Sequence, residues 1–338
     1  MNPGLANVLL AVLAAGLAWL TARTFTPHMR DAALRCGVVD RPDGRLKQQQ
    51  APVPYLGGLA VALGVLIALG VTFRFDRDAL AVLLAGAIVL ILGLVDDLGP
   101  LTPRVKLAGQ LLAALVLARA GVRIQLVFLP DWIELPLTVL WMVAVTNAFN
   151  LIDVMDGLSS GVGAVAALFL GGVALWSGFT TTGFLGAALT GALWGFRRFN
   201  VAPAQIYLGD AGSLFTGFVL GAMAMVNRWT SVHGLGAVVP AVVLGVPLFD
   251  MMFVMYIRWR RGLPVMLGSP DHVALRLRKW RLSTRATVRL NVGASVVLGA
   301  WGVAVMLAPL PWAIGLLAAL VATTLCLAIW LRTIDMTL

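Results

Sequence analysis

Acidic side chains are few in this sequence, and several of them stand together where they could hold a metal ion. Of 338 residues, only 15 are Asp or Glu. Asp96 and Asp97 are adjacent at the end of an apolar run, and Asp153 and Asp156 follow another such run at a spacing of three. The C-terminus of a helix carries a partial negative charge that disfavours carboxylates, so these acids need a compensating cation. The two pairs predict a divalent metal site.

Simpler explanations exist for both acidic pairs. Acids at the ends of apolar runs can mark the water interface, and the asparagines Asn147 and Asn150 before Asp153 can hydrogen-bond neighbouring helices. Polar residues inside membrane segments are costly, however, and are usually functional. A functional site is therefore the better explanation.

A third acid lies in the run Gly209-Asp210-Ala211-Gly212-Ser213, which begins another apolar stretch. Backbone N–H groups at a helix N-terminus bind phosphate oxygens, and Asp210 there could hold a hard cation. Ordinary N-capping explains the run equally well. Because Mg²⁺ takes one or two carboxylates plus substrate phosphates, the three segments together predict Mg²⁺ that bridges phosphates. The sequence has neither a Gly-x-x-x-x-Gly-Lys loop nor a Gly-x-Gly-x-x-Gly turn, which argues against an ATPase or a dinucleotide-binding enzyme.

The elements that must position these residues are membrane-spanning helices. Sixty per cent of the residues are hydrophobic and 12% are charged, and the mean hydropathy is +0.93. These values lie outside the usual range of soluble globular domains. They exclude a soluble cytosolic enzyme and predict an all-α, polytopic integral membrane protein. The two cysteines, Cys36 and Cys326, lie near opposite ends of the chain, so a zinc site is not expected.

Uncharged apolar runs predict eleven transmembrane helices in one domain that covers residues 1–338. A spanning helix needs about 20 apolar residues. The runs are 2–22, 55–73, 79–95, a weaker one at 104–120, 135–152, two helices in 157–196 with a turn at Ser177-Gly178, 211–226, 235–257, and two helices in 290–331 with a turn at Pro309 and Pro311. No Lys or Arg precedes the first run, which favours a retained helix over a cleaved signal peptide.

The distribution of Lys and Arg orients these helices. With the N-terminus outside and the C-terminus in the cytosol, the cytosolic segments hold 20 of the 25 basic residues, in agreement with the positive-inside rule. This topology explains most of the net charge of +10 without nucleic acid. It also places the acids named above on the cytosolic side. The expected catalytic loops are at about 38–54, 96–106, 147–157, 197–213 and 258–289.

Several motifs occur in a fixed order along these loops. They are Tyr55-Leu56-Gly57-Gly58 after Pro-Val-Pro, Gly-Leu-Val-Asp96-Asp97-Leu with Lys106 and Gln110, Asn147-Ala-Phe-Asn150-Leu-Ile-Asp153-Val-Met-Asp156-Gly157-Leu, Leu-Gly209-Asp210-Ala-Gly212-Ser213, and Pro247-Leu-Phe-Asp250. From about residue 38 to residue 283, the chain resembles the polyprenyl-phosphate N-acetylhexosamine-1-phosphate transferases, glycosyltransferase family 4. It is more similar to the branch that transfers GlcNAc-1-phosphate to undecaprenyl phosphate than to the phospho-MurNAc-pentapeptide branch.

The resemblance implies an enzyme of the plasma (inner) membrane with roughly ten or eleven spans and an active site that faces the cytosol. It implies Mg²⁺ or Mn²⁺, a UDP-sugar donor and a polyprenyl (undecaprenyl) phosphate acceptor, and it leaves a homodimer open. The enzyme would transfer GlcNAc-1-phosphate or a related HexNAc-1-phosphate, release UMP and start lipid-linked cell-envelope glycan synthesis. The alternative is a cation-coupled membrane transporter, whose acids would lie at mid-membrane rather than at one face.

The resemblance also implies roles for individual residues. By motif position, the catalytic residues are Asp96, Asp97, Lys106, Asp153 and Asp156, and the metal ligands are Asp97, Asp156 and Asp210. The substrate-binding residues are Asn150, Tyr207, Gly209, Ser213, His272 and Arg276. Tyr207 would stack on the uracil ring. Direct attack by the lipid phosphate is favoured over an aspartyl intermediate, because a phosphate monoester is already an oxyanion.

The sequence departs from the family pattern at two places. Val154 stands between the aspartates where Gly is usual, and the usual His-x-His-His run is reduced to His272 before Arg276. Within 273–281, apolar residues recur at helical spacing among basic ones, which is typical of a helix on an anionic membrane surface. Asp250, inside the ninth run, is equally compatible with helix packing and with the site.

Overall fold

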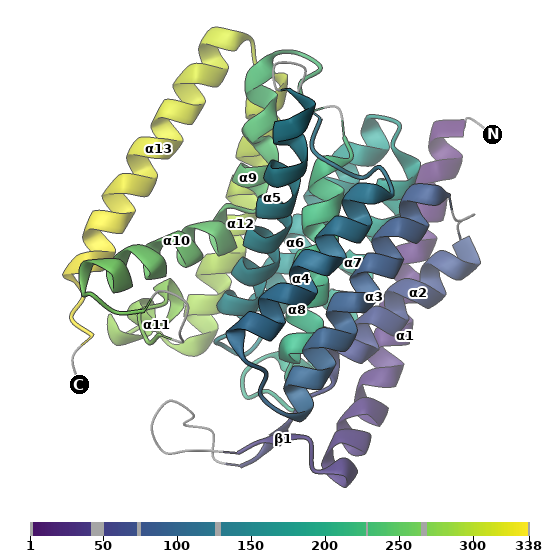
Figure 1. Ribbon diagram of the computed structural model, residues 1–338, viewed down its shortest axis with the longest axis vertical. Helices are drawn as coiled ribbons and strands as arrows, with labels where there is room; N and C mark the ends of the chain where they lie inside the picture. The colour runs from purple at the N-terminus through teal and green to yellow at the C-terminus, as the bar shows by residue number, and fades with distance from the viewer. Residues whose placement is uncertain are drawn as a thin grey trace.

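The protein is a bundle of helices (Figure 1). The computed structural model describes residues 3–41, 51–72, 76–125, 130–227, 229–264 and 269–336. The helices are α1 (Pro3–Cys36), α2 (Gly57–Thr72), α3 (Arg77–Leu98), α4 (Pro103–Arg119), α5 (Asp131–Ile152), α6 (Leu158–Trp176), α7 (Thr180–Asn200), α8 (Gly209–Met225), the 3-10 helix η1 (Gly234–Val238), α9 (Val239–Val243), α10 (Gly245–Arg260), α11 (Val273–Lys279), α12 (Thr284–Leu307) and α13 (Leu310–Thr333). In this part of the chain, β1 (Val39–Asp40) and β2 (Val53–Pro54) form a small sheet.

Six of the described helices are long and apolar enough to cross a membrane: α1, α3, α5, α6, α12 and α13. The bent pair of η1–α9 and α10 would add a seventh. The expected polytopic helical membrane protein is therefore confirmed. A helix overlaps each of the predicted apolar runs, and both predicted turns are present. Ser177 and Gly178 separate α6 from α7, and Pro309 precedes α13.

α1 is longer than the predicted first span. It continues past Ala22 to Cys36 and has 34 residues, which corresponds to about 50 Å. Its buried face contains small residues such as Ala18 and Ala22. It packs on α7, where a Cβ at Gly191 or Gly195 would collide with the α1 backbone. Small residues on both helices permit this close approach, and the extra turns of α1 lead the chain into the β1–β2 hairpin.

The segment between α1 and α2 adds a small two-stranded sheet to an otherwise helical chain, which the all-α expectation did not include. β1 and β2 pair antiparallel, with Val39 opposite Pro54 and Asp40 opposite Val53. The Pro-Val-Pro sequence favours extended backbone, which suits a short strand better than a helix. The hairpin also docks on the loop before α8, where the Tyr207 N–H donates to the Pro54 carbonyl at 2.9 Å. It thereby fixes one side of the candidate site.

The predicted ninth span, 235–257, is not one straight helix. Residues 234–243 and α10 meet at an angle of 78°. Pro240 and Pro247 lack the N–H that continues a helix, and Gly245 begins α10 directly after the break. As a result α10 leaves the direction of the bundle and projects sideways toward the lower end of α13 (Figure 1).

α13 stands apart from the other helices (Figure 1). In its most apolar stretch only 6% of the residues are buried. Its buried residues are Ala313 near one end and Leu331 near the other. Leu331 belongs to a small second core, together with residues of α10 and α11 such as Phe253 and Val273. This second core is separate from the main core, which fills the bundle.

Candidate active site

Ends of several helices meet at one end of the bundle, where α3 and α5 finish and α4 and α8 begin. α3 approaches α8 closely, because a Cβ at Gly93 would lie only 2.5 Å from the Ala211 Cα. The start of α2 also joins this group, since the Gly58 N–H donates to the Leu208 carbonyl at 2.9 Å. Glycines in contact with backbone therefore bring together helix ends that are far apart in the sequence.

Asp97 connects the end of α3 to the beginning of α8. Its Oδ1 accepts from the Asp210 N–H at 2.8 Å and its Oδ2 from the Ala211 N–H at 3.1 Å. Gly209 is left-handed (φ +72°), and a Cβ there would lie 2.6 Å from Asp97 Oδ2, so this position requires glycine. The positive end of the α8 dipole compensates the carboxylate. Two N–H groups of the run predicted to bind phosphate therefore hold Asp97.

Lys106, in the first turn of α4, lies between two carboxylates. Its Nζ is 2.7 Å from Asp96 Oδ2 and 2.5 Å from Asp210 Oδ2. The Leu101 N–H donates to Asp96 Oδ1 at 2.6 Å, which fixes the turn between α3 and α4. The ammonium offsets the repulsion that the two carboxylates would otherwise exert on each other.

The two asparagines of α5, Asn147 and Asn150, contact different parts of the structure. Asn150 Nδ2 donates to Asp210 Oδ1 at 2.7 Å and to Ser213 Oγ at 3.0 Å. Asn147 Nδ2 instead donates to Gln110 Oε1 at 2.6 Å and so ties α5 to α4. Asn147 thus makes the helix-packing contact considered above, and a site role for Asn150 stays a prediction. The linked residues Asp96, Asp97, Lys106, Asn150 and Asp210 are called the carboxylate cluster below.

Asp153 and Asp156 lie in the short turn between α5 and α6, next to the carboxylate cluster. Burial raises the pKa of Asp153 well above its usual value, and the carboxylates Asp210, Asp97 and Asp156 raise it further. Burial also raises the pKa of Asp156, against the opposing effect of the Ala204 N–H, which donates to its Oδ2 at 2.9 Å. The site thus holds more carboxylates than Lys106 can neutralise.

Two tyrosines stand on the hairpin side of the site. The rings of Tyr55 and Tyr207 are 6.0 Å apart between centroids. Burial, with help from Asp156, raises the pKa of Tyr207 to about 12. Burial and a hydrogen bond to Asp40 also raise the pKa of Tyr55. Both phenols are therefore neutral near pH 7, and uracil stacking by Tyr207 stays a prediction.

His272 belongs to a different polar group, at the junction of α10 and α11. Its Nδ1 lies 2.7 Å from Asp250 Oδ2, and the Val273 N–H donates to Asp250 Oδ1 at 2.7 Å. His272 and Asp250 are both buried. Of the two interpretations of Asp250, packing is the one its contacts show. Within the described residues His272 has no hydrogen bond to the carboxylate cluster, and its role as a substrate ligand stays a prediction.

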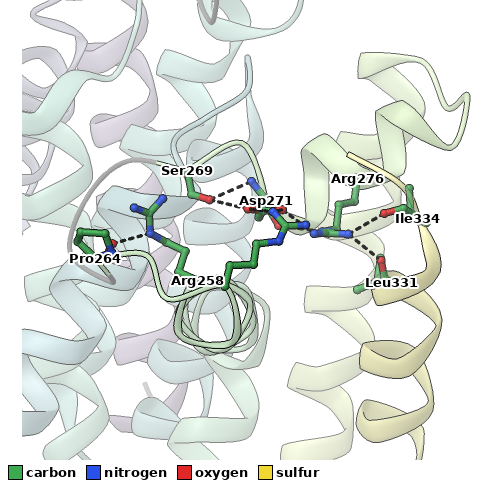
Figure 2. Close-up of polar contacts among 8 residues, drawn as sticks. Arg258, Pro264, Ser269, Asp271, Arg276, Leu331 and Ile334 are labelled. Carbon is green, nitrogen blue, oxygen red and sulfur yellow. Dashed lines mark hydrogen bonds and ion pairs between the residues drawn. The ribbon is translucent and has the colours of Figure 1, made fainter. Parts of the chain in front are cut away.

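Arg276, the other predicted substrate ligand in this loop, points at the end of α13 (Figure 2). Its Nη1 donates to the carbonyls of Leu331 and Ile334 at 3.0 and 2.9 Å, and its Nη2 donates to Asp271 Oδ1 at 2.6 Å. Asp271 also accepts from Arg261 Nη1 at 3.1 Å. Asp271 is on the expected cytosolic side with the other acids that one site could gather, but its contacts are with Arg276 and Arg261 rather than with the carboxylate cluster. A substrate role for Arg276 stays a prediction.

α11 confirms a helix within 273–281, but its basic residue Arg276 is buried, and a position of this helix on the membrane surface stays a prediction. Val273 and Leu277 are buried in the second core, whereas Arg278 is exposed. Trp280 packs edge-on against Trp330 of α13, with ring centroids 5.1 Å apart. α11 therefore uses its apolar face to contact α10 and α13.

Comparison with known proteins identifies the family. A sequence profile of glycosyl transferase family 4 matches residues 79–228. The chain is 32% identical over 278 residues to the probable undecaprenyl-phosphate N-acetylglucosaminyl 1-phosphate transferase of Bacillus subtilis, an alignment that covers 80% of this chain and 77% of the relative. The chain belongs to glycosyl transferase family 4.

Relatives of this family 4 chain come from both branches considered above. The decaprenyl-phosphate N-acetylglucosaminephosphotransferase of Mycolicibacterium smegmatis is 34% identical over 227 residues, which is 58% of this chain and 55% of the relative. The phospho-N-acetylmuramoyl-pentapeptide-transferase of Halalkalibacterium halodurans is 33% identical over 230 residues, 60% and 70% respectively. All three relatives are named as transferases, which does not support the transporter alternative. The range 79–228 contains the whole carboxylate cluster but neither His272 nor Arg276.

The donor set of this family 4 site suits a hard divalent cation in its chemistry. Carboxylate and amide oxygens are the ligands that Mg²⁺ prefers, and the site has an excess of carboxylates over Lys106. As the side chains stand, however, no three Asp, Glu, His or Cys residues of the described ranges are grouped as a metal site. The predicted ligands Asp97 and Asp156 hold backbone N–H groups, and Asp210 holds Lys106. Metal binding therefore stays a prediction.

Proposed function

We propose that this family 4 chain transfers GlcNAc-1-phosphate or a related HexNAc-1-phosphate from a UDP-sugar to a polyprenyl (undecaprenyl) phosphate. The products would be UMP and the lipid-linked sugar that starts cell-envelope glycan synthesis. The observation that carries the proposal is the carboxylate cluster, in which Lys106 bridges Asp96 and Asp210 inside the range that matches the family. The Bacillus subtilis and Mycolicibacterium smegmatis relatives are named for polyprenyl phosphates and N-acetylglucosamine, which supports these substrates.

In the proposed reaction, a phosphate oxygen of the lipid attacks the phosphorus that bears the sugar. The bond from that phosphorus to the bridging oxygen breaks, and UMP leaves with that oxygen. Two anionic groups must meet, so charge neutralisation and positioning are the main requirements. Lys106 is the cation of the carboxylate cluster and is placed to contact a phosphate oxygen that enters between Asp96 and Asp210.

The contacts of Asp97 support direct attack over an aspartyl intermediate. Both of its oxygens already accept N–H groups of α8, and an oxygen that holds a donor is a weaker nucleophile. Asp96 bonds to Lys106 with one oxygen and to the Leu101 N–H with the other. Asp96 or Asp97 would accept the last proton of the lipid phosphate.

The remaining predicted residues would bind the nucleotide and the metal. Asp97, Asp156 and Asp210 would hold Mg²⁺ or Mn²⁺, which supplies positive charge to phosphate oxygens when bound. Asn150 orients Asp210 through its 2.7 Å hydrogen bond. Tyr207, neutral near pH 7, would stack on uracil.

Asp153 and Asn150 would face the nucleotide diphosphate. Gly209 would offer its backbone N–H to a phosphate oxygen, and Ser213 would donate a hydrogen bond from its hydroxyl. His272 and Arg276 lie in the segment before α12. Their contacts are buried, so they would help to bind the substrate by holding this segment in position.

The proposed enzyme lies in the plasma (inner) membrane, with eleven spans and the N-terminus outside. The segments on the same side of the helix bundle as the candidate site contain most of the Lys and Arg residues, which supports a cytosolic active site. Cys36, exposed at the end of α1, provides a test in a Cys326→Ser variant. A membrane-impermeant thiol reagent should label Cys36 in inside-out vesicles alone. Labelling in right-side-out vesicles would reverse the orientation.

The test of the reaction is UMP release by the purified protein from a panel of UDP-sugars, with and without polyprenyl phosphate. We expect release that depends on the lipid, with UDP-GlcNAc preferred. Rapid exchange of labelled UMP into UDP-sugar without lipid would indicate an aspartyl intermediate. Absence of UMP release from every UDP-sugar tested would contradict the proposed function.

A further inference from the structure

A basic cavity of about 360 Å³ lies beside the candidate active site. It is lined by Asp156, Arg197 at the end of α7, Val201 and Ala202 in the next loop, and Arg285, Val288 and Arg289 at the beginning of α12. No member of the carboxylate cluster lines it. The cavity is therefore a space of its own, joined to the candidate site through Asp156.

The three arginines of the cavity donate to backbone carbonyls. Arg197 Nη1 donates to the Gly157 carbonyl, and Arg285 Nε and Nη2 donate to the Ala202 carbonyl at 3.1 and 3.0 Å. Arg289 Nε donates to the Arg285 carbonyl at 3.4 Å. Within the described ranges none of the three forms an ion pair. Because a guanidinium has five N–H donors, most of these donors are left for another acceptor.

Arg197 is held in place by the shape of α6. A Cβ at Gly161 would lie 2.5 Å from Arg197 Nη1, and one at Gly157 would lie 3.2 Å from it. On its other side the guanidinium lies 5.8 Å from the ring centre of Trp194, which is 55% exposed. Exposed tryptophans are typical of the level of the lipid headgroups. The exposed Trp194 thus supports a position of the Arg197 guanidinium near the level of phospholipid phosphates.

We propose that this cavity binds the phosphate of an anionic phospholipid headgroup. Three guanidinium groups face one carboxylate, and cations gathered in this way repel each other unless an anion lies among them. Guanidinium forks match phosphate oxygens, and Val201 and Val288 offer apolar surface for the start of the lipid chains. Basic pockets between transmembrane helices are known to take such headgroups.

The headgroup would act on the candidate active site through the loop between α7 and α8. Ala202 lines the cavity, and the Ala204 N–H donates to Asp156 at 2.9 Å. The same loop continues to Tyr207 and to Asp210 of the carboxylate cluster. An effect of anionic lipid on turnover rests on the proposed function, whereas lipid binding itself does not.

The test compares the full chain with the variant Arg285→Gln/Arg289→Gln in phosphatidylcholine vesicles that contain spin-labelled phosphatidylglycerol. Both arginines are exposed, so the variant should fold. Each removed arginine should weaken the association of phosphatidylglycerol with the protein about fivefold. The measured quantity is the fraction of spin-labelled lipid whose motion is restricted by the protein. The matched control is Arg104→Gln/Arg260→Gln, which removes two exposed arginines outside the cavity and should bind like the wild type.

Equally weakened lipid association in the control variant would overturn the proposal. It would show that phosphatidylglycerol is attracted by the basic surface of the protein as a whole and not by the cavity. Competition by inorganic phosphate as effective as competition by phosphatidylglycerol would overturn it in favour of a free-phosphate site. Displacement by UDP-GlcNAc or by undecaprenyl phosphate would assign the cavity to a substrate. Since binding is measured without turnover, a failed transferase assay would leave this result intact.

Discussion

The carboxylate cluster and the Arg276–Asp271 pair at the end of α13 both combine aspartates with a cationic side chain. They differ in how completely their charges are paired. In the carboxylate cluster, the side chains of Lys106, Asp96 and Asp210 are 22%, 11% and 29% exposed, and one ammonium serves several carboxylates. At the end of α13, the side chains of Arg276 and Asp271 are 1% and 2% exposed. One group is accessible and short of positive charge, and the other is closed.

This difference in exposure and charge balance indicates that the two groups have different roles. Accessible groups with unbalanced charge are typical of functional sites, because a ligand can complete them. A closed group stabilises the fold. Arg276 donates to the Leu331 and Ile334 carbonyls, at a helix end where carbonyls lack partners within the helix. Since the rest of α13 is hardly buried, we regard Arg276 as a residue that anchors α13 to α11.

Removal of divalent cations should have the largest effect, and it should act through the accessible group. We expect UMP release to stop in excess EDTA and to return when Mg²⁺ or Mn²⁺ is added, because Lys106 alone cannot neutralise the carboxylates and two substrate phosphates. The measurement is UMP release before and after chelation. Full turnover in excess EDTA would refute the metal prediction and weaken the contrast drawn here.

The substitution Asp210→Asn should lower kcat by about 10²–10³-fold, the range seen when one positioned charged group is lost from a site. The amide keeps the size of the side chain, so the protein should remain folded in detergent. The matched control is Asp31→Asn, an exposed acid of α1 whose partner is Arg30; this variant should retain wild-type activity. Wild-type rates for Asp210→Asn would show that the cluster is structural.

The substitution Arg276→Met should act on stability first. It removes the buried guanidinium from Asp271, which keeps Arg261 as its remaining ion-pair partner, and it removes the side-chain donor to two carbonyls. Breaking a buried ion pair costs about 3 kcal/mol. Arg276→Lys keeps the charge and should lose less. The KM for the UDP-sugar should stay unchanged in the fraction that folds, whereas a ligand of the donor would raise KM. Measuring thermal unfolding together with KM distinguishes an anchoring role from a role in binding the UDP-sugar. A raised KM at unchanged stability would contradict the anchoring role.

Much of the carboxylate cluster was predictable because acids are rare in this chain. The positions of Asp96, Asp97 and Asp210 at the ends of apolar runs, together with the basic bias of one side, placed these acids at one face without any contact being known. What the sequence could not show is that Asp97 binds the N–H groups of α8, since this depends on the close approach at Gly93. Motif position alone singled out Lys106, and its two partners are a result of the fold.

The anchor at α13 was not predictable for a different reason. The acceptors of Arg276 are the Leu331 and Ile334 carbonyls, which every residue type possesses. The bend in 235–257 carried a signal in Pro240 and Pro247, but apolar length alone favoured one span. The β1–β2 hairpin was missed because strands of two residues leave no period in the sequence.

The smallest expected effect concerns stability and acts through Asp153, a buried neighbour of the carboxylate cluster. The unfolded chain releases this proton near the ordinary Asp pKa of about 4, whereas burial and the carboxylates Asp210 and Asp97 raise the pKa of Asp153 in the folded chain. Between these two values the folded state binds more protons, so the free energy of unfolding falls as the pH rises. Asp153→Asn removes this titration. In EDTA at neutral pH the variant should therefore melt on the order of 2 °C higher than the wild type, with a shallower decline as the pH rises. Equal melting curves for the two proteins from pH 5 to pH 8 would show that the excess carboxylate charge is already offset, and the contrast between the two groups would then rest on exposure alone.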